Sequence, residues 1–276
     1  MPCQRWRRHR TSYRPSGEPI DTSQYGVEEI PEADAKSFVC THHYSASYPA
    51  ARRRMGLFRA GGGLVGVAVF SVPCQIRTIP CYAPDLHHSE GVELGRFVLL
   101  DDVPANGETW FLSKAFKLLK KSTPGLKAVI SYADPMSRAT PDGPVKPGHI
   151  GTIYQAYNGR YLGRSRKETH HFAPNGRLVN RRSLSKIRRG ERGDAGAYRS
   201  LLRNGAPTLR RGESGDGYVS RLIDDGFLRK VRHPGNHVYI WPLGRGVRTR
   251  DQLAYPKRPG SPEWWKARAI KEGALT

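Results

Sequence analysis

The pattern of apolar and polar positions predicts a chain in which strands alternate with helices. Two short apolar runs within residues 56–72 are joined by three consecutive glycines and predict a β-hairpin, because glycine permits the positive φ angles of tight turns. Residues 93–100 and 127–133 are dense in apolar and β-branched side chains, as in strands buried within a sheet. Between them, residues 109–121 place apolar side chains on one face at helical spacing, with Thr109 as the expected cap. This order predicts a βαβ crossover with two parallel strands.

The second half of the chain continues the alternation. Residues 149–158 predict a short amphipathic helix, and residues 170–181 predict a hairpin that turns at Asn175-Gly176. Residues 194–232 predict two or three short helices, and residues 237–243 predict a late strand. The whole order predicts an α/β or α+β fold with a mixed central sheet flanked by helices.

Composition adds a strong positive charge to this picture. The 276 residues include 46 Lys and Arg against 24 Asp and Glu, so the formal net charge is +22 and a nucleic acid is the expected partner. The longest apolar run, residues 64–70, is far shorter than the ~20 residues that span a bilayer, so no membrane partner is expected. Four cysteines without a CxxC pair argue against a zinc knuckle or a disulfide scaffold and predict a cytoplasmic location.

The charge is distributed unevenly. Residues 1–17 are basic with little apolar content and predict a disordered arm rather than a secretory signal. Residues 18–248 predict a single domain, and residues 249–276 predict a peripheral tail. Within that domain, residues 160–232 are basic with interleaved aromatic side chains, which favours contacts with a DNA backbone over a surface that is merely solvated. The arginines expected to bind DNA are Arg160, Arg164, Arg166, Arg181, Arg182, Arg188 and Arg189.

Five motifs, in this order, resemble those of the Mom family of phage DNA-modification proteins. They are HYS at residues 43–45, LGRF at 94–97, NxxTxFL at 106–112, SYAD at 131–134 and GHIGTIYQAYNGRYLG at 148–163. The resemblance covers about residues 38–165. Members of this family are similar in fold to GCN5-related N-acetyltransferases, and they convert the exocyclic amine of adenine in duplex DNA to a carbamoylmethylated form. The resemblance therefore implies an acetyltransferase-like enzyme that shields phage DNA from restriction.

Two departures from the family's pattern, and one difference from ordinary acetyltransferases, concern the donor and the geometry. Thr109 stands where the family has serine, and the stretch between SYAD and GHIG, residues 135–147, is unusually long. The chain also lacks the Arg/Gln-x-x-Gly-x-Gly/Ala loop with which acetyltransferases hold the pyrophosphate of coenzyme A, and VPANGETW stands there instead. The donor is therefore open between an acyl-CoA-like molecule and another small molecule.

The resemblance implies a catalytic set of Asp134, Tyr154, His43, Tyr44 and Arg96. Asp134 follows a predicted buried strand, where an α/β sheet delivers groups to its ligand, and it suits a general base or a ligand of an activating metal. The alternative for Asp134 is a cap of the turn at the following proline. His43 suits proton transfer, and with Asp134 it would form part of an iron-type site whose third ligand cannot be assigned. The alternative for the histidine and its neighbouring tyrosine is an ordinary surface position.

The remaining candidates concern anions and the donor. Arg96 lies in an apolar strand, so we expect its guanidinium to bind an anion, either Asp134 or a carboxylate or phosphate of the donor, unless it extends from an edge strand to water. Tyr154 suits a general acid for the leaving group, although its helical spacing also fits the core. Asn106 and Thr109 would orient the donor or cap the helix, or do both.

The leading interpretation is a phage-encoded enzyme that modifies adenine in DNA, with the base flipped out of the duplex. An acyl-CoA-dependent N-acetyltransferase of another amine is a first alternative, against which the missing pyrophosphate loop argues. A non-catalytic DNA-binding protein is a second, which would explain the charge alone. A nuclease would need clustered acids for metal ions, and the acids of this chain are scattered.

Overall fold

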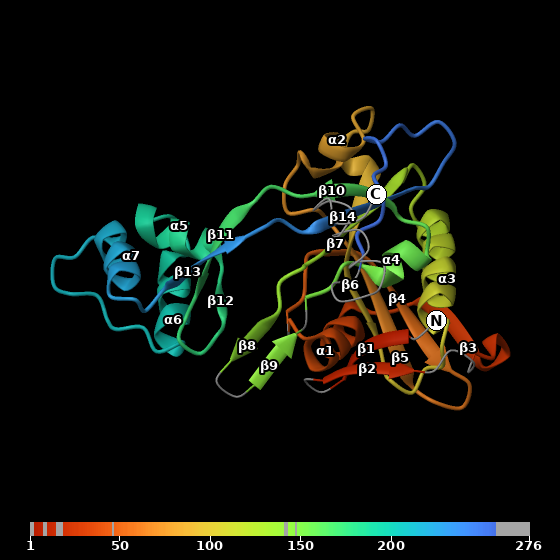
Figure 1. Cartoon of the computed structure of the whole chain (residues 1–276), viewed down its shortest axis with the longest axis horizontal. Coiled ribbons are helices and arrows are strands. Elements are labelled where there is room, and N and C mark those ends of the chain that lie inside the picture. The colour runs from red at the N-terminus through yellow and green to blue at the C-terminus, as the bar shows by residue number, and fades with distance from the viewer. Residues whose placement is uncertain are drawn as a thin grey trace, which may run out of the picture. The chain divides into compact units, whose positions relative to one another are not determined.

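The computed structural model describes residues 3–7, 10–14, 19–45, 47–140, 143–146 and 148–257. The chain divides into two compact units (Figure 1). Unit 1 comprises Met1–Pro135, Gly148–Ser165 and Asn236–Thr276, and unit 2 comprises Met136–Pro147 and Arg166–Gly235. This division differs from the single domain predicted over residues 18–248.

Unit 1 is built on a mixed seven-stranded sheet, as the apolar pattern predicts. In sheet order, its strands are β10 (Arg160–Arg164), β14 (His237–Pro242), β7 (Ala128–Ala133), β6 (Gly91–Leu99), β5 (Leu64–Ser71), β4 (Ala51–Arg59) and β3 (Tyr25–Glu29). Neighbouring strands are antiparallel except β6 and β7, which are parallel and joined through α3 (Gly107–Ser122). The predicted hairpin and βαβ crossover are therefore confirmed.

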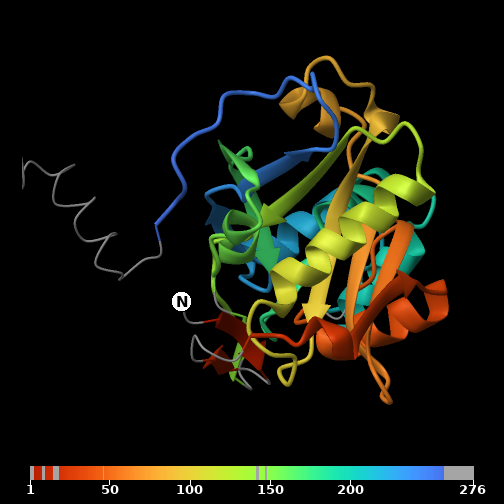
Figure 2. The ribbon, with the colours of Figure 1, turned by 90° about the vertical axis from the view of Figure 1, so that its right-hand side faces the viewer.

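Helices cover both faces of this sheet because its central strands are apolar on both sides. Ala68 and Phe70 of β5 pack in one core with the apolar face of α3, which lies across the sheet in Figure 2. Val67 and Val69 point the other way and pack with α1 (Glu32–His42). Full burial of a valine or phenylalanine side chain of this kind contributes ~1.5–3 kcal/mol to folding.

The start of α3 differs from the predicted one. The helix begins at Gly107, and Asn106 precedes it in the left-handed region at φ 65°. A Cβ on Gly107 would lie 2.6 Å from Val103, so this position requires glycine. The Thr109 hydroxyl lies one turn into the helix and donates to the Asn106 carbonyl at 3.1 Å, so the prediction of Thr109 as the cap residue is wrong.

The remaining elements of unit 1 are short. They are β1 (Cys3–Arg7), β2 (Arg10–Arg14), the 3₁₀ turns η1 (Thr22–Gln24) and η2 (His88–Glu90), α2 (Thr78–Tyr82) and α4 (Thr152–Ala156). Strands β1 and β2 pair antiparallel, so the described part of the arm that we expected to be disordered contains a hairpin.

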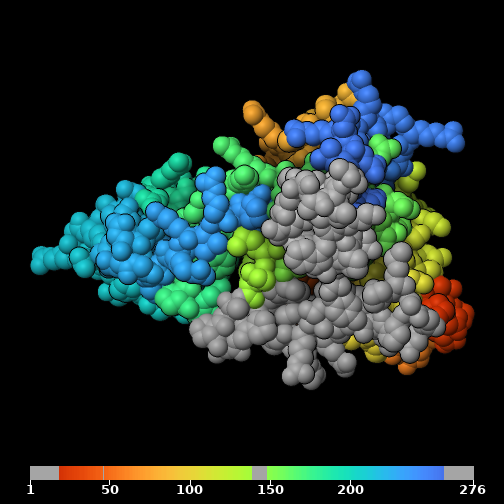
Figure 3. All heavy atoms as spheres, in the orientation of Figure 1, coloured from red at the N-terminus to blue at the C-terminus, as the bar shows by residue number. Residues whose placement is uncertain are grey.

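Unit 2 combines a small sheet with three helices. Its sheet has the order β12 (Leu178–Val179), β11 (Glu168–Phe172) and β13 (Arg229–His233), and its helices are α5 (Arg181–Arg189), α6 (Asp194–Arg203) and α7 (Gly215–Asp224). A separate hairpin pairs β8 (Arg138–Thr140) with β9 (Gly143–Lys146). The helices enclose an apolar core that includes Leu184, Leu201 and Tyr218, and their outer side chains form much of the teal surface in Figure 3.

The hairpin of unit 2 is present, but its turn is not the predicted two-residue one. Gly176 N donates to Ala173 O, and Ala173 N donates to Arg177 O, so three residues form the loop. Pro174 occupies the first turn position, where its fixed φ suits a type I turn, and Gly176 follows at φ 73°. The helices predicted within residues 194–232 are confirmed, whereas α5 is an additional helix.

The described part of the C-terminal tail packs on unit 1. Arg250 N donates to Tyr82 O, Leu253 N donates to Tyr161 O, and Tyr255 packs against the apolar core on the α3 side of the sheet. Residues 249–257 thus lie along the surface of unit 1 with most of their side chains exposed, and residues 258–276 lie outside the described part. No helix among the described residues is long and apolar enough to cross a bilayer.

Candidate active site

Strands β6 and β7 diverge after a short parallel ladder. Their paired residues are Gly91 with Ala128, Val92 with Val129, and Glu93 with Ile130. Beyond them, Ser131 Oγ of β7 donates to Leu94 O of β6 at 3.0 Å, and the ladder ends. We call residues 94–99 and 131–133 the strand fork. In this fork, the backbones of β6 and β7 no longer continue the parallel ladder between the two strands.

The phenol of Tyr154 meets this fork. Its hydroxyl is hydrogen-bonded to Ser131, and burial raises the pKa of Tyr154 to about 12. Its ring packs edge-on against Tyr239 at 5.5 Å and Trp241 at 5.6 Å between centroids. The ring of Tyr154 therefore packs in the core while its hydroxyl reaches the fork, and its role as a general acid stays a prediction.

The glycine before α4 explains why this tyrosine can lie so close to the sheet. Gly151 has φ 78°, and a Cβ there would lie 2.7 Å from the Tyr239 ring and 2.9 Å from the Tyr154 ring. The Tyr239 hydroxyl donates to Ile150 O and receives a hydrogen bond from Gln155 Nε2 at 3.0 Å. The GHIGTIYQ motif thus fixes α4 against β14.

Arg96 lies on β6 within the fork and holds the loop that follows α1. Its Nε donates to Ser47 O at 2.9 Å, its Nη2 to Ser47 Oγ at 2.8 Å, and its Nη1 to Gly95 O at 2.6 Å. The guanidinium therefore binds neutral oxygens of its own chain, and among the described ion pairs it has none with Asp134. Within the chain, Arg96 thus positions this loop, and its contact with an anion of the donor stays a prediction.

The loop held by Arg96 carries His43 and Tyr44. Their rings are in contact at 4.1 Å between centroids, tilted by 33°. Tyr44 also lies close enough to Tyr154 to raise its pKa electrostatically, although burial is the largest cause of that shift. Ser45 N donates to His43 Nδ1 at 3.1 Å, so the neutral imidazole carries its proton on Nε2. The structure thus brings Tyr44, Arg96 and Tyr154 together, with His43 beside them.

Asp134 follows β7 directly, as predicted, and is half-buried. Its carbonyl accepts a hydrogen bond from His149 N at 2.9 Å, which returns the chain to the end of β7 after the long insertion. Residues 136–147 of that insertion belong to unit 2. The unusual length of this loop therefore does not separate Asp134 from the segment that carries Tyr154.

Glu93 is a candidate that the sequence pattern misses. It is the last paired residue of β6 before the fork, and burial raises the pKa of its carboxyl while the Arg96 charge opposes that shift. Its charge also acts on Tyr154. In sequence it is one polar residue at the start of an apolar run, and the only signal was that an unpaired carboxylate inside a buried strand is costly.

His43 and Asp134, the two metal ligands considered from the sequence, have no third potential ligand close to both among the described residues. Among the described residues, three or more potential ligands approach one another in one place, formed by Glu168, His170 and His233 of unit 2. His43 and Asp134 are in no such group, so the residues described around them do not support the iron site considered from the sequence.

The predicted donor-binding residues lie at the start of α3. Asn106 is exposed, and Thr109 is half-buried with its hydroxyl on the Asn106 carbonyl. Glu108, 5% exposed, places a carboxylate in the first helical turn. An acidic side chain in the first turn complements the positive end of the helix dipole.

The seven predicted DNA-binding arginines fall in both units. Arg160 and Arg164 lie on β10 of unit 1, and the other five lie in unit 2. On α5, Arg182 and Arg189 pair with Glu191, and Arg188 pairs with Asp216. Leu184 and Ile187 face the core, so the basic side chains of this helix point outward.

The chain matches the model of the Mom protein family over residues 24–259. It is 27% identical over 173 residues to the methylcarbamoylase Mom of Escherichia phage Mu, an alignment that covers 62% of this chain and 66% of that protein. The chain thus spans just under two thirds of the length of this curated relative.

Two solved structures of acetyltransferases are similar to parts of the chain. A tandem GNAT protein from the clavulanic acid biosynthesis pathway is 8% identical, with a TM-score of 0.40 over 80% of this chain and 99% of that one. A dodecameric spermidine N-acetyltransferase from Vibrio cholerae is 12% identical, with a TM-score of 0.28 over 41% of this chain and 71% of that one. Because both scores lie below 0.5, the fold is judged from the sheet itself.

Proposed function

The chain belongs to the Mom protein family, and from this premise we propose that it is a transferase that modifies the exocyclic amine of adenine in DNA. The group transferred is the carbamoylmethyl group, in keeping with the methylcarbamoylase name of its phage Mu relative. The modified DNA would resist restriction enzymes in the cytoplasm of a host bacterium. The donor is a small molecule whose leaving group departs as the new C–N bond forms.

The observation that carries this proposal is that the residues at the strand fork lie within the range matched by the family model. The matched range includes the residues that meet at or beside the fork, which are Tyr44, Glu93, Arg96, Ser131 and Tyr154, and also Asp134, which follows β7 directly. A fork between two central strands is a place where a ligand can replace the missing ladder hydrogen bonds.

The residues divide the chemistry between a base and an acid. The adenine amine is a weak nucleophile because its lone pair is delocalised into the ring, so a carboxylate that accepts its proton in the transition state speeds the attack. Asp134 and Glu93 are the carboxylates available for this step. Tyr154 keeps its proton at neutral pH, since its pKa is raised to about 12, and it can donate that proton to the leaving group. Arg96 contributes indirectly by fixing the loop with His43 and Tyr44.

The residues at the start of α3 bear on the chemical class of the group donor. VPANGETW stands where acetyltransferases have the glycine-rich loop that holds the pyrophosphate of coenzyme A at a helix N-terminus. We therefore favour a donor without a pyrophosphate, with Asn106 and Thr109 as the residues that contact it. An acyl-CoA-dependent acetyltransferase remains the second candidate function.

The test is a measurement of nucleosides. The chain is expressed in a bacterium, and the total DNA is digested and analysed by mass spectrometry for a deoxyadenosine that is heavier by a carbamoylmethyl group. We expect this species with the native chain and its loss with Asp134→Ala. A deoxyadenosine heavier by an acetyl group would favour the second candidate, and unmodified DNA from cells with abundant folded protein would contradict the proposal.

The DNA itself would be held by the arginines of α5 and its surroundings. The target amine is base-paired in duplex DNA, so the base must be flipped out at a cost of a few kcal/mol, which contacts to the phosphate backbone would offset. Such contacts displace bound counterions. The logarithm of the binding constant therefore falls linearly with the logarithm of the salt concentration, with a slope of about 0.9 per phosphate contacted. The helix supplies four exposed or half-exposed guanidinium groups within nine residues.

A matched pair of variants tests this grip. The first replaces all four arginines of α5 by alanine, Arg181, Arg182, Arg188 and Arg189. The second removes the same charge from α3 by replacing its four exposed lysines, Lys114, Lys117, Lys120 and Lys121. We expect a lower affinity and a shallower salt slope for the first variant, with an unchanged circular dichroism spectrum, and a smaller change for the second. Equal changes in the two variants would show that net charge alone drives binding.

A further inference from the structure

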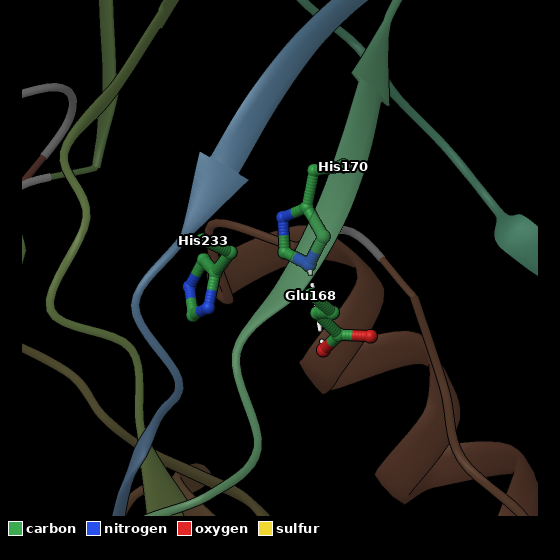
Figure 4. A group of neighbouring side chains, drawn as sticks. All are labelled: Glu168, His170 and His233. Atoms are coloured by element: carbon green, nitrogen blue, oxygen red, sulfur yellow. Dashed lines mark ion pairs between the residues drawn. The ribbon is translucent and has the colours of Figure 1, made fainter.

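Unit 2 contains a cluster of potential ligands that the proposed reaction does not use. Glu168 and His170 lie two residues apart on β11, so both side chains point to the same face of the small sheet. His233 ends the neighbouring strand β13 and pairs directly with Glu168 in the antiparallel ladder. Figure 4 shows the two imidazoles side by side, with the carboxylate below them.

The geometry within this cluster is close to that of a metal site. The ligand atoms of the three residues all lie within 4.8 Å of one another. The rings of His170 and His233 stack at 4.4 Å between centroids, and His170 Nε2 lies 3.6 Å from Glu168 Oε1. Ligand atoms bound at ~2.0–2.2 Å to one tetrahedral ion stand ~3.3–3.6 Å apart. Small side-chain rotations therefore bring the three ligand atoms to distances at which one ion can bind them all.

We propose that Glu168, His170 and His233 form a binding site for a divalent transition-metal ion of the zinc class. Two imidazoles and one carboxylate are a donor set that suits such ions, whereas magnesium and calcium prefer sites made of oxygen atoms. His233 is 1% exposed and His170 is half-buried, so two of the ligands are already removed from bulk water. Three protein ligands leave a fourth position for water.

One hydrogen bond opposes metal binding at this site. His233 Nδ1 accepts from Gly235 N at 3.1 Å, which places the proton of the neutral ring on Nε2. An ion at Nε2 therefore requires the proton to move to Nδ1 and the bond from Gly235 to be given up. The carboxylate of Glu168 supplies a negative charge that the ion can neutralise, which favours occupation of the site.

The position of the cluster in the chain gives the ion a structural role. Glu168 and His233 are the outermost paired residues of the β11–β13 ladder, close to the points where the chain enters and leaves unit 2. A bond between them through a metal closes a loop that contains all three helices of the unit. Such a cross-link stabilises the folded state by limiting the freedom of the unfolded chain, as a disulfide does.

The experiment is a titration of the untagged, chelator-treated full chain with zinc chloride, followed by calorimetry. All four cysteines are first replaced by serine, so that thiolates do not compete for the ion. We expect one zinc ion per chain, with an affinity at least about tenfold lower in Glu168→Gln and in His170→Ala. His171→Ala is the matched control, since His171 lies on the same strand but points to the opposite face, and it should bind as the parent does.

Two further readouts keep the result decisive. Glu168→Gln changes an exposed carboxylate into an amide of the same size, so its fold should persist even if a variant of buried His233 unfolds. Zinc should raise the melting temperature of the parent and leave that of Glu168→Gln unchanged. The absence of stoichiometric binding by the parent, or equal binding by the parent, Glu168→Gln and His170→Ala, would overturn the proposal.

Discussion

A buried histidine predicts how unit 1 responds to acid. His237 begins β14, is 2% exposed, and its Nδ1 lies 2.9 Å from the Tyr161 hydroxyl. Burial, with a smaller contribution from the Arg164 charge, lowers the pKa of His237 to about 4. In an unfolded chain the same imidazole titrates near ~6.5. The folded protein therefore resists a proton that the unfolded chain accepts.

The sign and the size of the effect follow from this difference. Above pH ~6.5 the imidazole is neutral in both states and contributes no pH dependence. As the pH falls from ~6.5 to about 4, only the unfolded chain takes up the proton, so the free energy of unfolding decreases. A difference of ~2.5 pKa units at ~1.4 kcal/mol each gives a loss of about 3 kcal/mol, which ends once the folded state is protonated as well.

The assay is urea denaturation at several pH values between 4 and 7 for the native chain and for His237→Asn. The variant has no titratable group at this position, so the difference between the two chains isolates His237 from every other histidine. We expect the native chain to lose about 3 kcal/mol more than the variant over this range. Parallel curves for the two chains would show that His237 is protonated in the folded state as easily as in the unfolded one.

Other predictions concern packing and the fork. Gly215→Ala should destabilise unit 2 by ~1–3 kcal/mol, because its Cβ would lie 1.9 Å from Ile187 O, whereas Gly196→Ala, with open space around its Cβ inside α6, should stabilise it by up to ~1 kcal/mol. Melting temperatures check both, and a loss of stability in Gly196→Ala would contradict the packing argument. Glu93→Gln should raise the free energy of unfolding near pH 7, because it removes a buried charge, and this gain should vanish in acid, where the folded native carboxyl is protonated too. Denaturation at pH 7 and pH 4 measures the gain, and a loss of stability at pH 7 would refute it.

The central sheet can be predicted from the sequence because its elements carry a full apolar period. The glycines at 61–63 mark the hairpin, and the run from Phe111 to Leu119 shows one apolar helix face that the structure buries. Unit 2 is harder to predict because its apolar positions are sparse. In α5 only Leu184 and Ile187 are buried, and the arginines around them conceal the helical period. The joining of residues 136–147 to residues 166–235 in one unit leaves no local signal at all.

Two residues of the candidate site could be predicted because each lies next to a recognisable element or motif of the sequence. Asp134 lies directly after an apolar strand, and Tyr154 lies within a distinctive motif, so both could be identified. The role of Arg96 could not, because its partner Ser47 is far away in sequence and the contact depends on how the loop after α1 folds back. Glu93 was missed because its burial arises from the divergence of β6 and β7, which no local pattern records.

The central claim is that the hydroxyl of Tyr154 acts at the strand fork, and two tyrosines of one motif test it. Both rings pack against Trp241, but the Tyr154 hydroxyl is bonded to Ser131 at the fork, whereas the Tyr157 hydroxyl is bonded to Ser113 of α3. The measurement is the fraction of carbamoylmethylated deoxyadenosine in DNA from cells that express Tyr154→Phe or Tyr157→Phe at equal levels. The account predicts a loss of at least about tenfold for Tyr154→Phe and near-native modification for Tyr157→Phe. Equal modification of DNA by the two variants would contradict it.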